Sequence, residues 1–171
     1  MKYIFASDVH GSSKYLNILL QKFEESKADK LVLLGDLYYH GPRNPLPEEY
    51  SPKDCIKALN NIKDKLIVVQ GNCDAEVDQM VSEFPIIKDV IISVDGLNLF
   101  LTHGHIYGPQ NIPANAGDVL LYGHYHVTNM EKKDNVYLLS PGSISLPKCN
   151  TEHSYIIIED NKIILKNVDG K

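Results

Sequence analysis

The sequence predicts an α/β protein in which two β-sheets pack face to face and helices lie outside them. The first half alternates short apolar runs with helical patterns, which is typical of parallel strands joined by helices. The second half is rich in strand-like runs, several of them paired around tight turn sequences. With 171 residues, of which 43% are hydrophobic, the chain fits one domain, 1–171, with a full core.

Three strands and two helices are predicted in the first half. Residues 2–6, 31–34 and 66–69 are apolar runs without polar alternation, as expected for strands that are covered on both faces. A helix over about 13–27 has serines at its start and one apolar stripe at helical spacing. A second helix, over about 52–61, begins with proline, which is favoured in the first turn. This order of elements implies parallel strand pairing.

Segment 38–50 and the second half of the chain differ in composition from the alternating strands and helices of the first half. Segment 38–50 carries three prolines and one glycine, so we expect a loop, and loops of this length are often functional. Asp95-Gly96 and Asp160-Asn161 are turn sequences between strand-like runs, and we expect mostly antiparallel pairing in this half. The predicted strands are 90–94, 97–101, 119–122, 136–139, 154–159 and 162–167.

Composition limits the environment and the partners. No apolar run approaches membrane-spanning length, and Met1-Lys2-Tyr3 leads directly into strand residues, so we expect a cytoplasmic protein without a signal peptide or membrane contact. Three widely spaced cysteines fit a reducing compartment. The net charge of −5 and the lack of a dense basic run argue against long nucleic acids, whereas a small anionic substrate fits if a metal supplies positive charge. An apolar surface around 85–87 or the hairpins could support a homo-oligomer.

Polar residues follow five of the predicted strands. Asp36 comes directly after the second strand and Gly35, at the sheet edge where open α/β proteins bind ligands. A carboxylate at the end of a buried strand is costly unless a cation meets it. Asp8 and His10 follow the first strand two residues apart, and in an extended segment such side chains point the same way. The complete set is Asp8, His10, Asp36, Asn72, His103, His105, His124 and His126.

This set of residue types predicts a metal site. One such residue after a strand is usually a turn former or a helix cap, but five strand ends that all carry metal-ligand types indicate one shared site. Carboxylate, imidazole and amide groups without a thiolate cluster suit Mn, Fe or Zn. Leaving His105 aside, seven ligands are too many for one ion, whereas two ions about 3.5–4 Å apart would use them all and could clamp phosphoryl oxygens. Asp36 is the natural bridge between the ions.

The motifs in order resemble the calcineurin-like metallophosphoesterases over almost the whole chain. They are Asp8-x-His10-Gly11, Gly35-Asp36, Gly71-Asn72-x-Asp74, Thr102-His103-Gly104-His105 and Gly123-His124-x-His126. Segments 71–80, 40–44 and 141–143 are further similar to the small bacterial YfcE-type phosphodiesterases. The resemblance implies a four-layer αββα sandwich of two mixed sheets, with a dinuclear centre at the carboxyl ends of the strands.

The resemblance also implies a division of the ligands between two divalent ions. Manganese is the common ion, with iron, nickel and zinc as alternatives. One ion would be held by Asp8, His10 and His126, the other by Asn72, His103 and His124, and both by Asp36.

The candidate catalytic residues are Asp36, Asn72, Cys73, His103, His105 and His124. Cys73 stands where many superfamily members carry a histidine that can protonate the leaving group, and a thiol is a poorer proton donor near neutral pH. Cys73 can equally be a small buried filler. His105 either positions phosphate or supports the metal ligands.

Residues of the long loop are weaker candidates. Arg43 and Asn44 could hold a substrate phosphate, because arginine suits bidentate phosphate contacts, but a structural role in the turn is as good an explanation. The same holds for His40.

We therefore expect a metal-dependent phosphodiesterase that hydrolyses a small phosphodiester by in-line attack of a metal-bridged hydroxide. His103 and His124, with the metals, would stabilise the pentavalent transition state. The same metal core permits a phosphomonoesterase or a dinucleotide polyphosphate hydrolase. A non-catalytic scaffold is the other alternative, since a retromer subunit resembles this family and has lost ligands. All seven ligand positions here carry competent side chains, which argues against a scaffold.

Overall fold

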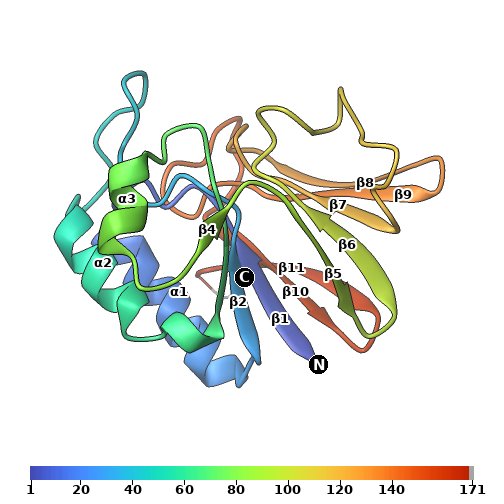
Figure 1. Ribbon diagram of the computed structural model, residues 1–171, viewed down its shortest axis with the longest axis horizontal. Coiled ribbons are helices and arrows are strands. Elements are labelled where there is room, and N and C mark those ends of the chain that lie inside the picture. The colour runs from blue at the N-terminus through green and yellow to red at the C-terminus, as the bar shows by residue number, and fades with distance from the viewer. Residues whose placement is uncertain (170–171) are drawn as a thin grey trace.

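The computed structural model describes residues 1–169, and its strands form two sheets that face each other (Figure 1). The six-stranded sheet has the order β11-β10-β1-β2-β3-β4, and the five-stranded sheet has the order β5-β6-β7-β9-β8. The strands are β1 (Lys2–Ala6), β2 (Lys30–Leu33), β3 (Leu66–Val69), β4 (Ile86–Ile87), β5 (Val90–Val94), β6 (Leu97–Leu101), β7 (Val119–Leu121), β8 (Thr128–Lys133), β9 (Val136–Pro141), β10 (Ser154–Glu159) and β11 (Lys162–Asn167).

The helices are α1 (Ser13–Ser26), α2 (Pro52–Asn60) and α3 (Glu76–Val81), with a 3-10 turn at Lys63–Lys65. The hydroxyl of Ser12 accepts a hydrogen bond from the Tyr15 amide and so caps the start of α1. Lys27 ends α1 in a left-handed conformation. The predicted serine cap, the proline at the start of α2 and the end of α1 near Lys27 are all confirmed.

Three apolar clusters define the layers. The first lies between the helices and the six-stranded sheet, where Leu16 and Leu19 of α1 meet Ile4 and Leu31. The second lies between the sheets, with Phe5 on one side and residues of β6, β7 and β9 on the other. The third covers the outer face of the five-stranded sheet. The predicted α/β sandwich of two mixed sheets is therefore confirmed.

The outer layer over the five-stranded sheet differs from the helical layer that the αββα description implies. In the described part of the chain, all three α-helices lie on the side of the six-stranded sheet (Figure 1). The opposite face is covered by segment 102–118, whose Tyr107 and Ile112 pack against Phe100 and Leu120. Three glycines and two prolines fall within this segment, which explains why it forms a packed loop instead of a helix.

Most predicted elements match the structure, and both predicted hairpins have the predicted bounds. Strands β1, β2 and β3 pair in parallel, as the alternation of strands and helices indicated. The pairs β5–β6, β8–β9, β1–β10 and β10–β11 are antiparallel, whereas β7 pairs in parallel with β6 and β9. The elements α3, β4 and β8 were not predicted, because they are short or largely exposed. Among residues 1–169, no helix has the length and apolar character needed to cross a membrane.

Candidate metal centre

The loops after β1, β2, β3, β6 and β7 meet at one end of the sandwich. Backbone hydrogen bonds continue the strand pairing into these loops. The amides of Asp8 and His10 donate to the carbonyls of Gly35 (3.1 Å) and Asp36 (2.9 Å), and the Gly123 amide donates to the His103 carbonyl (2.7 Å). The carboxyl ends of strands from both sheets are therefore held in fixed register, and their polar side chains face one site.

The backbone conformation at this site is unusual. Five of the seven predicted metal ligands have positive φ: Asp8 (56°), His10 (48°), Asp36 (57°), His124 (71°) and His126 (59°). Left-handed conformations are uncommon for residues other than glycine and concentrate at functional sites. The extended geometry expected for Asp8 and His10 is therefore wrong. Their side chains converge because each backbone turns sharply after the strand.

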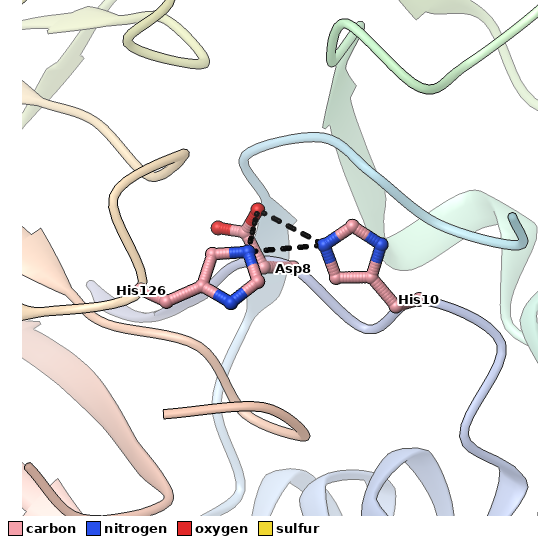
Figure 2. A group of neighbouring side chains, drawn as sticks. All are labelled: Asp8, His10 and His126. Atoms are coloured by element: carbon pink, nitrogen blue, oxygen red, sulfur yellow. Dashed lines mark hydrogen bonds and ion pairs between the residues drawn. The ribbon is translucent and has the colours of Figure 1, made fainter. Parts of the chain in front are cut away.

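Asp8, His10 and His126 form the first group of donors (Figure 2). Asp8 Oδ1 lies 3.5 Å from His10 Nε2 and 3.3 Å from His126 Nε2. The two Nε2 atoms lie 3.1 Å apart, and Figure 2 shows both rings directed at the Asp8 carboxylate. The residues come from the loops after β1 and β7, which belong to different sheets. These three side chains offer one carboxylate and two imidazoles to one point.

The second group surrounds Asp36 and Asn72. Asp36 Oδ2 lies 3.3 Å from His103 Nε2 and 3.6 Å from His10 Nε2. Asn72 Oδ1 lies 2.9 Å from His103 Nε2 and 2.9 Å from His124 Nδ1. Asp36 thus stands between the first group and the second, which is the position that a bridging carboxylate requires. Gly35 makes this packing possible, because a Cβ there would lie 2.6 Å from the His103 ring.

The donors of both groups fit cations. The Nδ1–H groups of His10, His103 and His126 donate to the carbonyls of Tyr39 (2.8 Å), Leu34 (2.6 Å) and Leu146 (2.7 Å). In the neutral imidazoles, Nε2 is then a lone-pair acceptor that points at carboxylate oxygens.

Asp8 Oδ1 is buried and accepts no hydrogen bond. Convergent acceptors repel one another unless protons or a metal ion lie between them, so this geometry suits divalent ions.

The electrostatics of the polypeptide reflect the same crowding. Burial alone would raise the pKa of Asp8, but His10 and His126 outweigh it and hold the pKa well below its usual range. Burial likewise opposes ionisation of Asp36, yet His103 lowers the pKa of that carboxyl. Burial would lower the pKa of His103, but Asp36 and Asp8 raise it to about 9. Asp36 and Asp8 therefore favour a proton on His103, and a metal ion bound there would displace that proton.

Asp74 is a supporting residue whose role the sequence analysis missed. Its side chain is 7% exposed, and it accepts backbone hydrogen bonds from Gly71 (2.7 Å), Asp36 (2.8 Å) and Leu37 (2.8 Å). Burial raises its pKa, against the opposite effect of these amides. Asp74 ties the loop after β3 to the loop after β2. The quoted Gly-Asn-x-Asp motif contains Asp74, but nothing local indicates where its carboxylate bonds.

Ser143 and Ser145 support the first group from β9's side of the site. Their hydroxyls donate to the Asp8 carbonyl at 2.8 Å and 3.0 Å. Ser143 Oγ also accepts the amides of Ser145 and Leu146. These bonds fix the backbone at Asp8, so Ser143 positions a donor of the first group.

A cavity of about 700 Å³ opens beside the metal-ligand cluster. Cys73 is half-buried in its wall, and burial together with Asp36 raises the pKa of the thiol to about 12. Arg43 and Asn44 also line the cavity, although the Asn44 amide donates to the His40 carbonyl as well. Lys148 lines the cavity too, and the sequence analysis missed it because no motif contains it.

His40 and His105 lie outside the wall of this cavity. The His40 ring packs edge-on against Tyr39 and Tyr50, with ring centroids 4.8 Å and 5.4 Å away, which favours a structural role. His105 is exposed and lines a second cavity of about 350 Å³, which shares Asn72 with the first. Its ring centroid lies 5.3 Å from that of His103, so His105 borders the cluster without joining its donors.

Comparison with known proteins identifies the family. The model of the calcineurin-like phosphoesterase superfamily domain matches residues 1–162. The chain belongs to this superfamily. Membership in the superfamily implies divalent metal ions, which the convergent acceptors described above fit. The resemblance inferred from the five motifs is thereby confirmed.

Among curated members of the calcineurin-like phosphoesterases, phosphodiesterase YfcE of Escherichia coli strain K12 is 45% identical over 163 residues. The match covers 94% of this chain and 89% of that protein. The solved structure of YfcE, described as an E. coli phosphoesterase, superposes with a TM-score of 0.96 at 42% identity and covers 100% of this chain and 96% of its own.

Similarity in fold extends to a more distant protein. Vps29 of Entamoeba histolytica, solved in complex with zinc, has a TM-score of 0.59 at 17% identity, covering 96% of this chain and 90% of its own. At this identity the likeness shows the shared fold alone.

Proposed function

We propose that this protein is a metal-dependent phosphodiesterase that uses two divalent ions to hydrolyse a small phosphodiester. The observation that carries the proposal is the convergence of imidazole Nε2 atoms on two carboxylates, one of which has a buried oxygen without a hydrogen-bond donor. The 45% identity to YfcE, a phosphodiesterase, supports the same reaction class. Manganese is the proposed ion, with iron, nickel and zinc as alternatives, since these ligand types suit all four.

The chain's own residues would hold and orient the reacting groups. Asp8, His10 and His126 would hold one ion, Asn72, His103 and His124 the other, and Asp36 both. Ions held by these residues would supply Lewis acidity, which polarises phosphoryl oxygens and lowers the pKa of water.

The protein holds these donors rigidly before any substrate arrives. The carbonyls of Tyr39, Leu34 and Leu146 fix three imidazole rings by accepting their Nδ1–H groups. Fixed rings need no reorganisation when charge develops on the phosphoryl group, and this preorganisation is a main source of rate enhancement. His103 and His124 both approach Asn72 Oδ1, and His124 also lines the large cavity. Together with the ions, these two residues would stabilise the pentavalent transition state.

The test measures hydrolysis of bis(p-nitrophenyl) phosphate beside p-nitrophenyl phosphate. Chelator-stripped protein is titrated with Mn²⁺, and Asp36→Asn is compared with Asp64→Asn, an exposed aspartate on the 3-10 turn. We expect diester cleavage that requires metal, exceeds monoester cleavage, and falls at least about 100-fold in Asp36→Asn but not in Asp64→Asn.

Faster cleavage of the monoester would replace the proposal with a phosphomonoesterase. Metal binding without cleavage of either ester would contradict an enzymatic role and indicate a scaffold. Equal activity of Asp36→Asn and the unmodified protein would refute the assignment of Asp36 as a bridging ligand.

A further inference from the structure

The cavity beside the metal-ligand cluster is larger than a phosphodiester group alone requires. Its volume of about 700 Å³ is in the range of sites that enclose whole small ligands. One side is formed by Asp36, Asn72, His124 and His126 of the cluster. The remaining wall comes from four places along the chain, which are the loop 39–44, Cys73 with Ala75, Tyr125 and Lys148. That remaining wall contacts the part of a substrate that does not react, so its chemistry indicates the substrate class.

Two cations line this wall without acidic partners. Arg43 comes from the long loop 38–50, and Lys148 comes from the segment after β9. Among residues 1–169, no carboxylate forms an ion pair with either side chain. Within the described part of the chain, Asp36 is the only acidic residue in the cavity wall, and the metal-ligand cluster already engages it. In a protein of net charge −5, two unpaired cations in one cavity indicate an anionic group in the ligand.

The wall that carries the cations is tied directly to the first donor group. The Lys148 amide donates to the His126 carbonyl at 2.8 Å. On the other side, the Tyr39 carbonyl accepts the Nδ1–H of His10 at 2.8 Å. Because His10 and His126 belong to one donor group, Lys148 and the loop of Arg43 are both tied to that group. A second anionic group could therefore be held at a defined distance from the first.

Two exposed aromatic rings line the same cavity. Tyr39 is 43% exposed and Tyr125 is 44% exposed, and both face the space beside the cluster. The Tyr125 ring packs edge-on against His124, with ring centroids 5.1 Å apart, which restrains it. Exposed aromatic rings in a cavity offer flat apolar surface on which a planar group can stack, as nucleobases do in many proteins.

We propose that the large cavity selects nucleotide-like phosphodiesters that carry a second phosphate group. Arg43 and Lys148 bind the second phosphate, and Tyr39 and Tyr125 contact the base. The inference rests on the proposed phosphodiesterase function and specifies its substrate class. It also explains why a chain without a dense run of basic residues carries two cations at this site, since they suit a short anion and not a polynucleotide.

The experiment compares two substrates that differ by one phosphate. Thymidine 5′-(p-nitrophenyl phosphate) and its 3′-phosphorylated form release the same leaving group, so their ratio of kcat/KM isolates the contribution of the second phosphate. We expect the 3′-phosphorylated substrate to be favoured about tenfold at low ionic strength, with the preference declining as salt is added. Equal kcat/KM for both would overturn the proposal.

Lys148→Gln and Arg43→Gln should each reduce this preference about threefold or more, chiefly through KM. The matched control is Lys88→Gln, which removes the same charge from an exposed lysine in the wall of the second cavity. An equal reduction in Lys88→Gln would refute a specific role for Arg43 and Lys148, because it would reflect net charge alone.

A binding measurement separates this inference from the proposed function. Calorimetry with the Mn²⁺-loaded protein compares thymidine 3′,5′-bisphosphate with thymidine 5′-monophosphate, and we expect about tenfold tighter binding of the bisphosphate. Tyr125→Ala should weaken binding of both about tenfold, whereas Tyr137→Ala, which alters an exposed tyrosine on β9, should not.

If bis(p-nitrophenyl) phosphate is not cleaved but the bisphosphate still binds preferentially, the reaction assignment fails and the ligand assignment stands. If the diester is cleaved and the bisphosphate shows no preference, only the ligand assignment fails.

Discussion

Replacing Asp74 by alanine should destabilise the protein strongly although Asp74 is not among the proposed metal ligands. The residue is 7% exposed, and its carboxylate accepts three backbone N–H groups at 2.7–2.8 Å, from Gly71, Asp36 and Leu37. Bonds to a charged acceptor contribute about 1.5–3 kcal/mol each, and the variant leaves three donors without partners. Relief of repulsion between Asp74 and Asp36 offsets part of this loss. We therefore expect the free energy of unfolding to fall by about 4 kcal/mol.

Urea denaturation of the metal-free protein measures this change. With a slope of about 2 kcal/mol per molar urea, the midpoint should fall by about 2 M. Asp74→Asn keeps the shape and one acceptor oxygen but places an amide against a backbone donor, so we expect about half that loss. The matched control is Asp78→Ala, which removes a half-buried carboxylate that accepts one backbone amide, from Ala75, and should cost about 1 kcal/mol.

A change below about 1 kcal/mol in Asp74→Ala would refute the reasoning, because it would mean that water or a rearranged loop satisfies the three amides. Because the same carboxylate holds the loops that carry Asp36 and Asn72, Mn²⁺ affinity should fall along with stability. Loss of stability at unchanged Mn²⁺ affinity would show that the loop positions do not depend on Asp74.

Two further substitutions test the packing around the site. Gly123→Ala should weaken Mn²⁺ binding at least about tenfold in calorimetry, because a Cβ there would lie 1.9 Å from Ser7 Oγ. The control is Gly96→Ala, in an open turn with φ of 88°, which should affect stability alone. Equal Mn²⁺ affinity in both variants would contradict the packing argument. Burial raises the pKa of Tyr38 to about 12, above its unfolded value near 10, so its stabilising effect is complete below pH 10 and declines as the pH rises toward 12. Tyr38→Phe removes the hydrogen bond to Ser82 (2.7 Å), so its free energy of unfolding at pH 7 should be about 1 kcal/mol lower than that of the unmodified protein. Between pH 7 and pH 12, however, the free energy of unfolding should fall less in Tyr38→Phe than in the unmodified protein. An equal fall in both proteins, measured by urea denaturation, would refute this.

Local signals in the sequence predicted the elements whose formation depends on near neighbours. Asp95-Gly96 and Asp160-Asn161 specified both hairpins, since these turns need residues that tolerate positive φ, and all four residues have it. Ser12 specified the start of α1 through a bond to an amide three residues away. In contrast, β8 (Thr128–Lys133) is polar and exposed, so its pairing with β9 left no apolar period to recognise.

The candidate donors were also visible in the sequence, because each follows an apolar strand directly. Their arrangement was not. The expected extended geometry of Asp8 and His10 failed because the left-handed turn at each residue is imposed by hydrogen bonds to the neighbouring strand's loop, such as the His10 amide to the Asp36 carbonyl. Strand ends therefore indicated which residues form the cluster, while contacts between loops decided how they point.

The sequence by itself thus determined the residue types of the site and the strands that deliver them. Only the tertiary structure decided that β7 lies between β6 and β9 and that β10 pairs with β1. It alone brought Asp74 to the Asp36 amide and Lys148 to the wall of the cavity. The physical reason is range. Strand and cap formation depends on residues a few positions apart, whereas Lys148 and Arg43 line one cavity although they lie about a hundred residues apart in the sequence, which no local pattern encodes.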